Sequence, residues 1–253
     1  MSGTFHDLGL LEVPGFGPRA VRVYVPERAD LHTRDEGPAL FLFDGQNVFG
    51  DEGSFAGGWH AHDAAESLGP RTVRVPILVG LANGGEKRMD ELTPWKDRRH
   101  GGAGGGAARF IDWIADRLVP RVRDGFAITP GPEGVFIGGS SLGGLASLYA
   151  HHRRPDVFGG ALCMSSSLFW SDRRIFDWLE KQPVPERSRL YLDCGAREAG
   201  GRMAEWMKEL VPLLRARGYG DDQLRVRLDP KGRHHESDWG RRLPGALRFL
   251  FKR

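Results

Sequence analysis

The stretch Val135-Phe-Ile-Gly-Gly-Ser-Ser-Leu-Gly-Gly144 decides the fold. It begins with a short β-branched and aromatic run typical of a buried strand, and residues 142–152 follow with apolar side chains at helical spacing. Between them, residues 139–143 fit the G-x-S-x-G pattern, in which glycines permit a tight strand-to-helix turn and the serine hydroxyl is exposed above the sheet. The pattern therefore predicts Ser141 as a nucleophile, with the backbone N–H of Leu142 at the helix start as one oxyanion donor.

A serine nucleophile of this kind needs a carboxylate and a histidine, which follow it along the chain in that order. Residues 189–195 read as a strand that ends at a glycine, and Glu198 comes just beyond it, where the acid of this architecture belongs. Asp193 is the alternative, although it lies inside the expected strand. A second strand, residues 223–229, has alternating apolar positions and leads through a turn to His234 and His235. Either histidine could take the proton of the serine, and local spacing does not choose between them.

Five stretches of the chain carry a family resemblance: FLFDGQNVF at 41–49, NGGEKRMDELTPW at 83–95, the turn and helix at 138–149, the segment 158–170, and HHESDW at 234–239. In these stretches the chain resembles an esterase family of the α/β-hydrolase superfamily, over nearly its whole length. That group includes feruloyl and acetyl-xylan esterases of carbohydrate esterase family one, enterochelin-esterase-like hydrolases, S-formylglutathione hydrolases and the mycolyltransferases.

The resemblance bears on the choice of base and acid. Family members carry a histidine followed two residues later by Glu and five residues later by Trp, which fits His234, Glu236 and Trp239 and so favours His234 over its neighbour. The family acid follows a Gly-x-x-Asp/Glu pattern, which places it at Glu198 behind Gly195.

The resemblance also suggests binding residues. Residues 39–43 form a continuous apolar strand followed by the turn Asp-Gly-Gln-Asn. By resemblance, the backbone N–H of Gln46 is the second oxyanion donor, and Asn47 beside it is expected to contact substrate. The segment 164–186 is expected to wall the acyl or alcohol pocket with Leu168, Phe169 and Trp170, residues that suit an ordinary core equally well.

The 253 residues are expected to form one α/β-hydrolase domain, residues 1–253. Strands alternating with helices at about 107–123, 142–152, 203–217 and 237–251 predict a mainly parallel central sheet flanked by helices. Alternation at 21–25 predicts that the sheet opens with antiparallel strands. No insertion of the size of a large lid domain is visible.

Metal and cofactor chemistry are not predicted. His60-Ala-His62-Asp63 resembles an H-x-H metal site, but no later histidine supplies a third ligand at a recognisable spacing, so this segment is expected to start a helix. His151 and His152 end the helix after Ser141, where cations suit the helix dipole, and are expected to be structural.

Composition limits the partners and the compartment. The net charge of +3 is only mildly basic, and the arginine pairs are scattered along the chain rather than gathered in one stripe, so nucleic-acid binding is not predicted. Cys163 and Cys194 read as buried thiols. Without a signal peptide or an apolar run of membrane-spanning length, a cytoplasmic protein with no membrane partner is expected. Oligomeric state is not predicted.

Together these features predict a serine carboxylesterase that forms an acyl-enzyme on a small-molecule ester without a cofactor. Acyl transfer on the same residues is the main alternative, and a non-catalytic binding protein of the same fold is another. The sequence leaves the ester open among short acyl esters, sugar-linked acetyl or feruloyl esters, siderophore lactones and thioesters.

Overall fold

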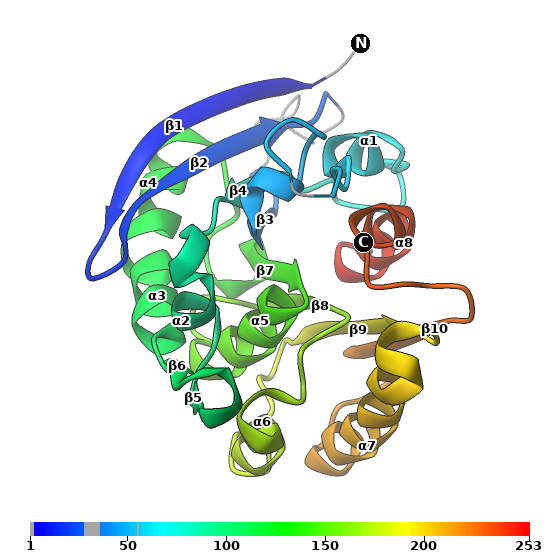
Figure 1. The fold of residues 1–253 in the computed structure, drawn as a ribbon. Helices are drawn as coiled ribbons and strands as arrows, with labels where there is room; N and C mark the ends of the chain where they lie inside the picture. Colours follow the sequence, from blue (N-terminus) through cyan, green and yellow to red (C-terminus); the bar gives the residue numbers. More distant parts are fainter. Residues whose placement is uncertain (1–2, 28–35, 55) are drawn as a thin grey trace.

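The computed structural model describes residues 3–27, 36–54 and 56–253. Its centre is an eight-stranded sheet (Figure 1) in the order β1 (Thr4–Val13), β2 (Gly17–Val25), β4 (Ile77–Leu81), β3 (Ala39–Phe43), β7 (Val135–Ser140), β8 (Gly160–Met164), β9 (Arg189–Gly195) and β10 (Leu224–Asp229). The pairs β1–β2 and β2–β4 are antiparallel, and all other neighbours are parallel. The mainly parallel sheet with an antiparallel start is as predicted.

Helices cover both faces of the sheet, which is why β3, β4, β7 and β8 are buried along their whole length. One face packs against α1 (Ala61–Glu66) and α8 (Glu236–Leu250). The other face packs against α3 (Ala107–Trp113), α4 (Val119–Gly125), α5 (Leu142–Arg153), α6 (Trp170–Leu179) and α7 (Arg202–Arg217). A π-helical turn, residues 114–118, joins α3 to α4.

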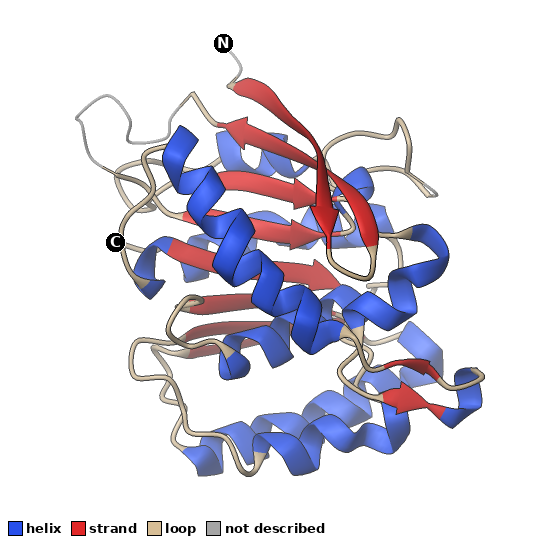
Figure 2. Ribbon diagram, turned by 90° about the vertical axis from the view of Figure 1, so that its left-hand side faces the viewer, coloured by secondary structure: helices blue, strands red, loops and turns tan. Residues whose placement is uncertain are grey.

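The remaining elements stand beside the sheet. They are α2 (Arg88–Leu92) and the small antiparallel pair β5 (Lys96–Asp97) and β6 (Ala103–Gly104), which Figure 2 shows away from the main strands. No large lid domain is present among the described residues, and no described helix is long and apolar enough to cross a membrane. Cys163 and Cys194 are buried free thiols, as predicted.

The edge strand β10 forms where it was predicted, with its apolar face only partly covered, because Leu224 is buried whereas Leu228 is 43% exposed. One local expectation was wrong in part. His151 and His152 are buried and neutral rather than cations at a helix end. Each donates its Nδ1–H to a backbone carbonyl, and burial lowers the pKa of His151 to about 3 and that of His152 to about 4.

Candidate active site

Ser141 occupies the sharp turn between β7 and α5. Its backbone has φ 58° and ψ −120°, a left-handed conformation that a non-glycine residue adopts only when its surroundings enforce it. The Ser141 N–H donates to the Met164 carbonyl at 3.0 Å, and the Ser141 carbonyl accepts from the Ser167 N–H at 3.0 Å. A Cβ on Gly139 would lie 2.9 Å from the Gly143 backbone, so the turn closes only with glycine there. The serine is thereby held at the carboxyl end of the central strand.

His234 and Glu198 meet across the loops that follow β10 and β9. His234 Nδ1 lies 2.9 Å from Glu198 Oε2. Glu198 is buried, whereas the His234 side chain is 39% exposed and faces the same cavities as Ser141. With Nδ1 engaged by the carboxylate, Nε2 is the ring nitrogen left for the serine side.

The Glu198 carboxylate is held by a second set of donors. Burial favours its neutral form, but hydrogen bonds from His234, from the Ser165 hydroxyl (2.8 Å) and from the Gly195 N–H (2.7 Å) outweigh burial and lower the pKa of Glu198. The carboxylate is therefore ionised at neutral pH. Gly195 is required here, because a Cβ at this position would lie 2.1 Å from the Gly232 carbonyl oxygen and 2.8 Å from Glu198 Oε1.

Ser165 links the acid to α8. Its hydroxyl accepts hydrogen bonds from Trp239 Nε1 at 2.9 Å and from Arg242 Nη2 at 3.0 Å. The Trp239 ring also meets the His234 ring edge to face, with centroids 4.9 Å apart. Trp239 therefore contacts both Ser165, which bonds to Glu198, and the His234 ring. These contacts give a physical reason for the tryptophan five residues after the histidine in the sequence pattern.

Asp193, the alternative acid, lies within β9 and faces α8. It forms a two-pronged ion pair with the fully buried Arg242, at 2.9 and 3.1 Å. Burial, only partly offset by Arg242, raises the pKa of Asp193 to about 6. Sequence reasoning missed Arg242, whose only local signal is its position three residues after Trp239 on the apolar face of α8.

His235 does a different job from His234. It is the N-cap of α8, and its Nδ1 accepts from the Ser237 N–H at 3.3 Å. Its neighbour His234, and not His235, is the histidine bonded to Glu198.

The loop that carries Gln46 is fixed by the buried Asp44. Asp44 has φ 57° and accepts from Arg88 at 2.7 and 2.8 Å and from Asn83 Nδ2 at 2.6 Å. The Asn83 N–H in turn donates to Gln46 Oε1 at 3.2 Å. Arg88 therefore pairs with Asp44, whereas the nearby Glu91 pairs with Arg19.

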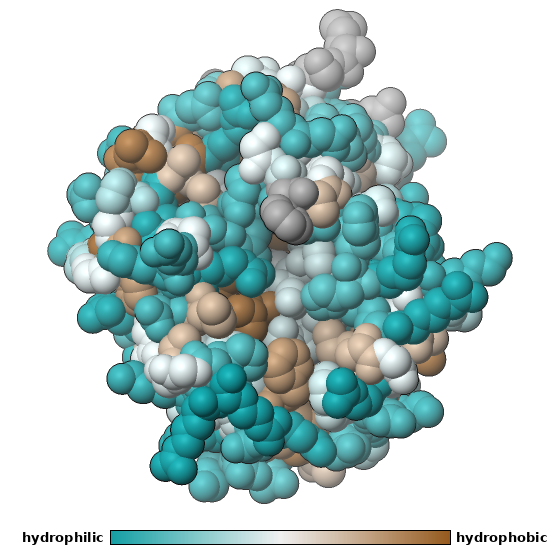
Figure 3. Space-filling model, in the orientation of Figure 1, coloured by the Kyte–Doolittle hydropathy of each residue, from teal (hydrophilic) through white to brown (hydrophobic). Residues whose placement is uncertain are grey.

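Two cavities meet at Ser141 and His234. The first, of about 380 Å³, is mainly apolar and is also lined by Arg99, Ser167, Phe169, Ala199, Arg202, Met203 and Trp206. The second, of about 350 Å³, is polar and is also lined by Asp44, Gln46, Asn47, Gly53, Asn83, Arg88, Ser140, Glu236 and Trp239. Figure 3 shows apolar side chains gathered around a central hollow on this face of the molecule.

The three expected wall residues take different places. Phe169 lines the apolar cavity, whereas Leu168 and Trp170 are buried in the core and line neither cavity. Trp170 donates its Nε1–H to the Trp95 carbonyl at 2.6 Å, and its ring stacks on His100 with centroids 4.6 Å apart. Asn47 lines the polar cavity. Sequence reasoning missed Met203 and Trp206, which lie one turn apart on the predicted helix α7.

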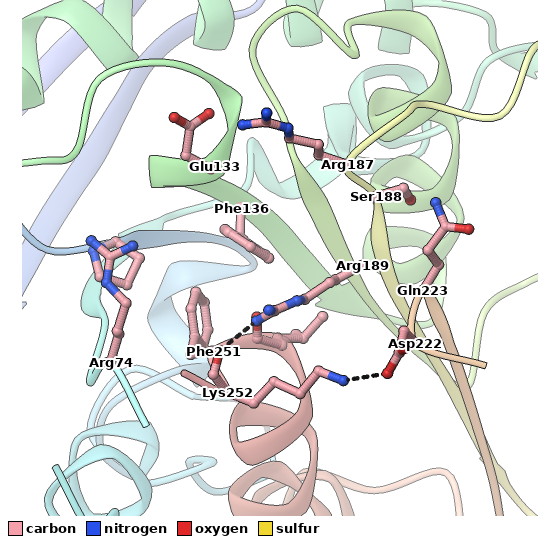
Figure 4. A pocket seen from close by; sticks show the side chains of 12 residues that line it. Arg74, Glu133, Phe136, Arg187, Ser188, Arg189, Asp222, Gln223, Phe251 and Lys252 are labelled. Atoms are coloured by element: carbon pink, nitrogen blue, oxygen red, sulfur yellow. Dashed lines mark hydrogen bonds and ion pairs between the residues drawn. The ribbon is translucent and has the colours of Figure 1, made fainter. Parts of the chain in front are cut away.

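A cavity of about 540 Å³, larger than the two at Ser141, lies elsewhere. Its lining includes Phe136 and Arg189 near the amino ends of β7 and β9, so it is at the opposite end of the strands from Ser141. Figure 4 shows Arg74, Arg187 and Arg189 around it. Among the residues that the structure describes, it shares no lining residue with the two cavities at Ser141.

Comparisons with known proteins agree with this architecture. The "Uncharacterized protein YbbA" of Bacillus subtilis is 25% identical over 247 residues, covering 93% of each chain. The iron(III) salmochelin esterase of Escherichia coli is 28% identical over 181 residues, covering 68% of this chain and 39% of that protein. The crystal structure of the BES protein from Bacillus cereus superposes with a TM-score of 0.75 at 19% identity, covering 99% of this chain and 96% of that one. The family model described as "Putative esterase" matches residues 17–250, so the chain belongs to this esterase family and is a hydrolase that acts on ester bonds.

Proposed function

We propose that the protein is a serine carboxylesterase in which Ser141, His234 and Glu198 form the catalytic triad. The observation that carries this proposal is the 2.9 Å contact between His234 and the buried Glu198, with His234 facing the same two cavities as the strained Ser141. A nucleophile, a base and an orienting acid in this arrangement are the parts that acyl-enzyme chemistry requires.

In the proposed reaction, Ser141 Oγ attacks the ester carbonyl carbon while His234 Nε2 accepts the serine proton. The carbonyl oxygen becomes an oxyanion that the backbone N–H groups of Leu142 and Gln46 stabilise, each contributing about 2.7–4 kcal/mol. Collapse of the tetrahedral intermediate breaks the ester C–O bond, and His234 returns the proton to the leaving alcohol. Water then attacks the acyl-enzyme with His234 again as base, which releases the carboxylic acid and restores Ser141.

Glu198 assists through charge and orientation. Its carboxylate holds Nδ1–H of His234 and stabilises the imidazolium that forms in each step, without itself accepting a proton. The donors that keep Glu198 ionised, Ser165 and the Gly195 N–H, bond to Oε1 and leave Oε2 for His234.

The two cavities suggest the substrate class. Phe169, Met203 and Trp206 give one side an apolar wall. Arg202 adds positive charge to it, whereas Arg99 is paired with Asp172. We propose an ester with an aromatic, anion-bearing group on this side and a polar group on the other. The similarity to the salmochelin esterase supports a siderophore-type ester within this class.

Kinetics on p-nitrophenyl esters from acetate to octanoate test the triad. Ser141→Ala and His234→Ala should each lower kcat/KM by about 10⁴ or more, and Glu198→Gln by about 10⁴. His235→Gln is the matched control and should retain most activity, because that side chain only caps α8. The triad is wrong if the wild-type protein hydrolyses none of these esters and no fluorophosphonate label attaches to Ser141.

A matched substrate pair tests the apolar side. An ester with a ring carboxylate should have a lower KM than the same ester with a carboxamide, and Arg202→Gln should remove the difference. Arg202 suits this test because it lines the cavity and its side chain donates a hydrogen bond to the Ala199 carbonyl at 3.3 Å rather than to a carboxylate. Equal KM values for the two esters in the wild-type protein would rule out an anion-binding side while leaving the triad intact.

A further inference from the structure

A second group of chemistry-bearing side chains lies at the start of α1. One ligand atom each from His60, His62 and Asp63 lies within 4.8 Å of the others, and this is the one such His/Cys/Asp/Glu group in the described parts of the chain. His60 Nδ1 is 4.0 Å from Asp63 Oδ2, and His62 Nε2 is 3.5 Å from Asp63 Oδ1. None of the three lines either cavity at Ser141, so the triad does not use them.

The backbone brings these side chains together against the usual helical pattern. Residues two apart on a helix point to different sides, so an H-x-H pair within one helix would not converge. Here His60 lies just before α1 in the left-handed conformation, with φ 51° and ψ 45°. That turn places the His60 and His62 rings 6.1 Å apart. The backbone of His60 is strained, and its side chain lies beside those of His62 and Asp63. Backbone strain at such a place points to a function.

In both His60 and His62, one ring nitrogen is available to a cation and the other is not. His60 Nε2 is 3.1 Å from Asp51 Oδ1, so Nδ1 is the nitrogen that faces Asp63. Asp51 is itself fixed by the Gly58 N–H at 2.8 Å. His62 Nδ1 is buried, so Nε2 is the nitrogen that a cation from solvent can reach. An imidazole whose second nitrogen is held by a carboxylate is the usual arrangement of a metal-binding histidine.

We propose that His60 Nδ1, His62 Nε2 and an Asp63 carboxylate oxygen bind a divalent transition-metal cation of the zinc type, with Asp51 orienting His60. Two ligands at 2.0–2.2 Å on a tetrahedral Zn²⁺ stand about 3.4 Å apart. The two ligand pairs at 3.5 and 4.0 Å are close to that separation, and the exposed side chains of His60 and Asp63 can rotate to close the rest. The fourth position faces solvent and would hold water. Asp63 thus supplies the third ligand that a search for a third histidine misses.

The position of the site predicts what the cation would do. The two residues flanking His60 bond to the loop that follows Gln46: the Trp59 N–H donates to the Asn47 carbonyl at 2.8 Å, and the Ala61 N–H donates to the Val48 carbonyl at 2.9 Å. A cation joining His60 to Asp63 would clamp this loop to α1. We therefore expect metal binding to raise the melting temperature.

The test is Zn²⁺ titration of the chelator-treated full chain by calorimetry, with Co²⁺ absorption to report tetrahedral coordination. One Zn²⁺ should bind per chain, and His60→Gln, His62→Gln and Asp63→Asn should each weaken binding at least tenfold. Asp51→Asn should weaken it by about 10–100-fold and shift the Co²⁺ spectrum, whereas Asp51→Glu should restore both. His6→Gln, at an exposed histidine on β1, is the control and should bind like the wild type.

Two results would overturn the proposal. One is the absence of saturable binding at micromolar Zn²⁺ by the wild-type protein. The other is binding that persists unchanged in all three ligand variants, which would place the cation elsewhere. Circular dichroism of each variant separates loss of binding from loss of the fold.

Discussion

Acidification to about pH 5.5 should destabilise the protein through the buried pair His151 and His152. His151 Nδ1 donates to the Phe158 carbonyl at 2.9 Å, and His152 Nδ1 donates to the Leu148 carbonyl at 3.0 Å. Their Nε2 atoms face the Ser188 and Tyr219 hydroxyls. The folded state therefore holds both rings neutral, and burial lowers the pKa of His151 to about 3 and of His152 to about 4.

The sign and size of the effect follow from these values. Because the folded-state pKa values lie below the unfolded value of about 6.5, the unfolded chain binds more protons as the pH falls. The stabilisation is complete above pH 6.5 and is lost progressively below it. At about pH 5.5 each histidine costs about 1.4 kcal/mol and the pair about 2.8 kcal/mol.

Urea denaturation, followed by tryptophan fluorescence, measures how the free energy of unfolding changes with pH. Between about pH 7.5 and pH 5.5, the free energy of unfolding of His152→Gln should fall by about 1.4 kcal/mol less than that of the wild-type protein. The difference between the two proteins cancels the titration of other groups. His6→Gln replaces an exposed histidine on β1 and is the control, whose curve should parallel the wild type. If the His152→Gln and wild-type curves are parallel over this range, the buried neutral histidine is not the source of acid sensitivity.

Three further changes test the site and its supports. Gly195→Ala should lower kcat about 100-fold with little change in KM for p-nitrophenyl acetate, because the new Cβ displaces Glu198; unchanged kcat would contradict the tight contact. Asp193→Asn should cost about 3–5 kcal/mol in thermal or urea unfolding, because it removes the two-pronged partner of the buried Arg242 and leaves only the Glu198 carboxylate at 3.7 Å; a loss below about 1 kcal/mol would refute this. Trp206→Ala should raise KM for octanoate about 5–30-fold and leave acetate nearly unchanged, and an equal effect on both esters would remove Trp206 from the acyl side.

Features that depend on neighbouring residues along the chain were accessible from the sequence. The apolar strand, the glycine-bounded turn and the helix around Ser141 each have a local signal, and they appear in the fold as predicted. The acid and the histidine also have local signals, because each follows the end of a predicted strand. Glu198 and His234 are in contact in the structure. Ser165 and Arg242, which act on Glu198 from outside this local stretch, have no such signal, because they come from the segment after β8 and from α8, 77 residues apart.

The predictions that failed, for the cavity wall and for His151 and His152, have the same physical origin, because contacts with residues distant in the chain decide them. Leu168, Phe169 and Trp170 are consecutive apolar residues in an irregular segment, so no period assigns one to the cavity and its neighbours to the core. The Trp170 ring is held by a hydrogen bond to the Trp95 carbonyl, 75 positions away, and by stacking on His100. The dipole argument at His151 and His152 was likewise sound for an exposed helix end, but the Phe158 carbonyl and the Ser188 and Tyr219 hydroxyls enclose that end. Burial outweighs the helix dipole there, because the free-energy cost of desolvating an imidazolium exceeds the stabilisation that a helix C-terminus gives a cation.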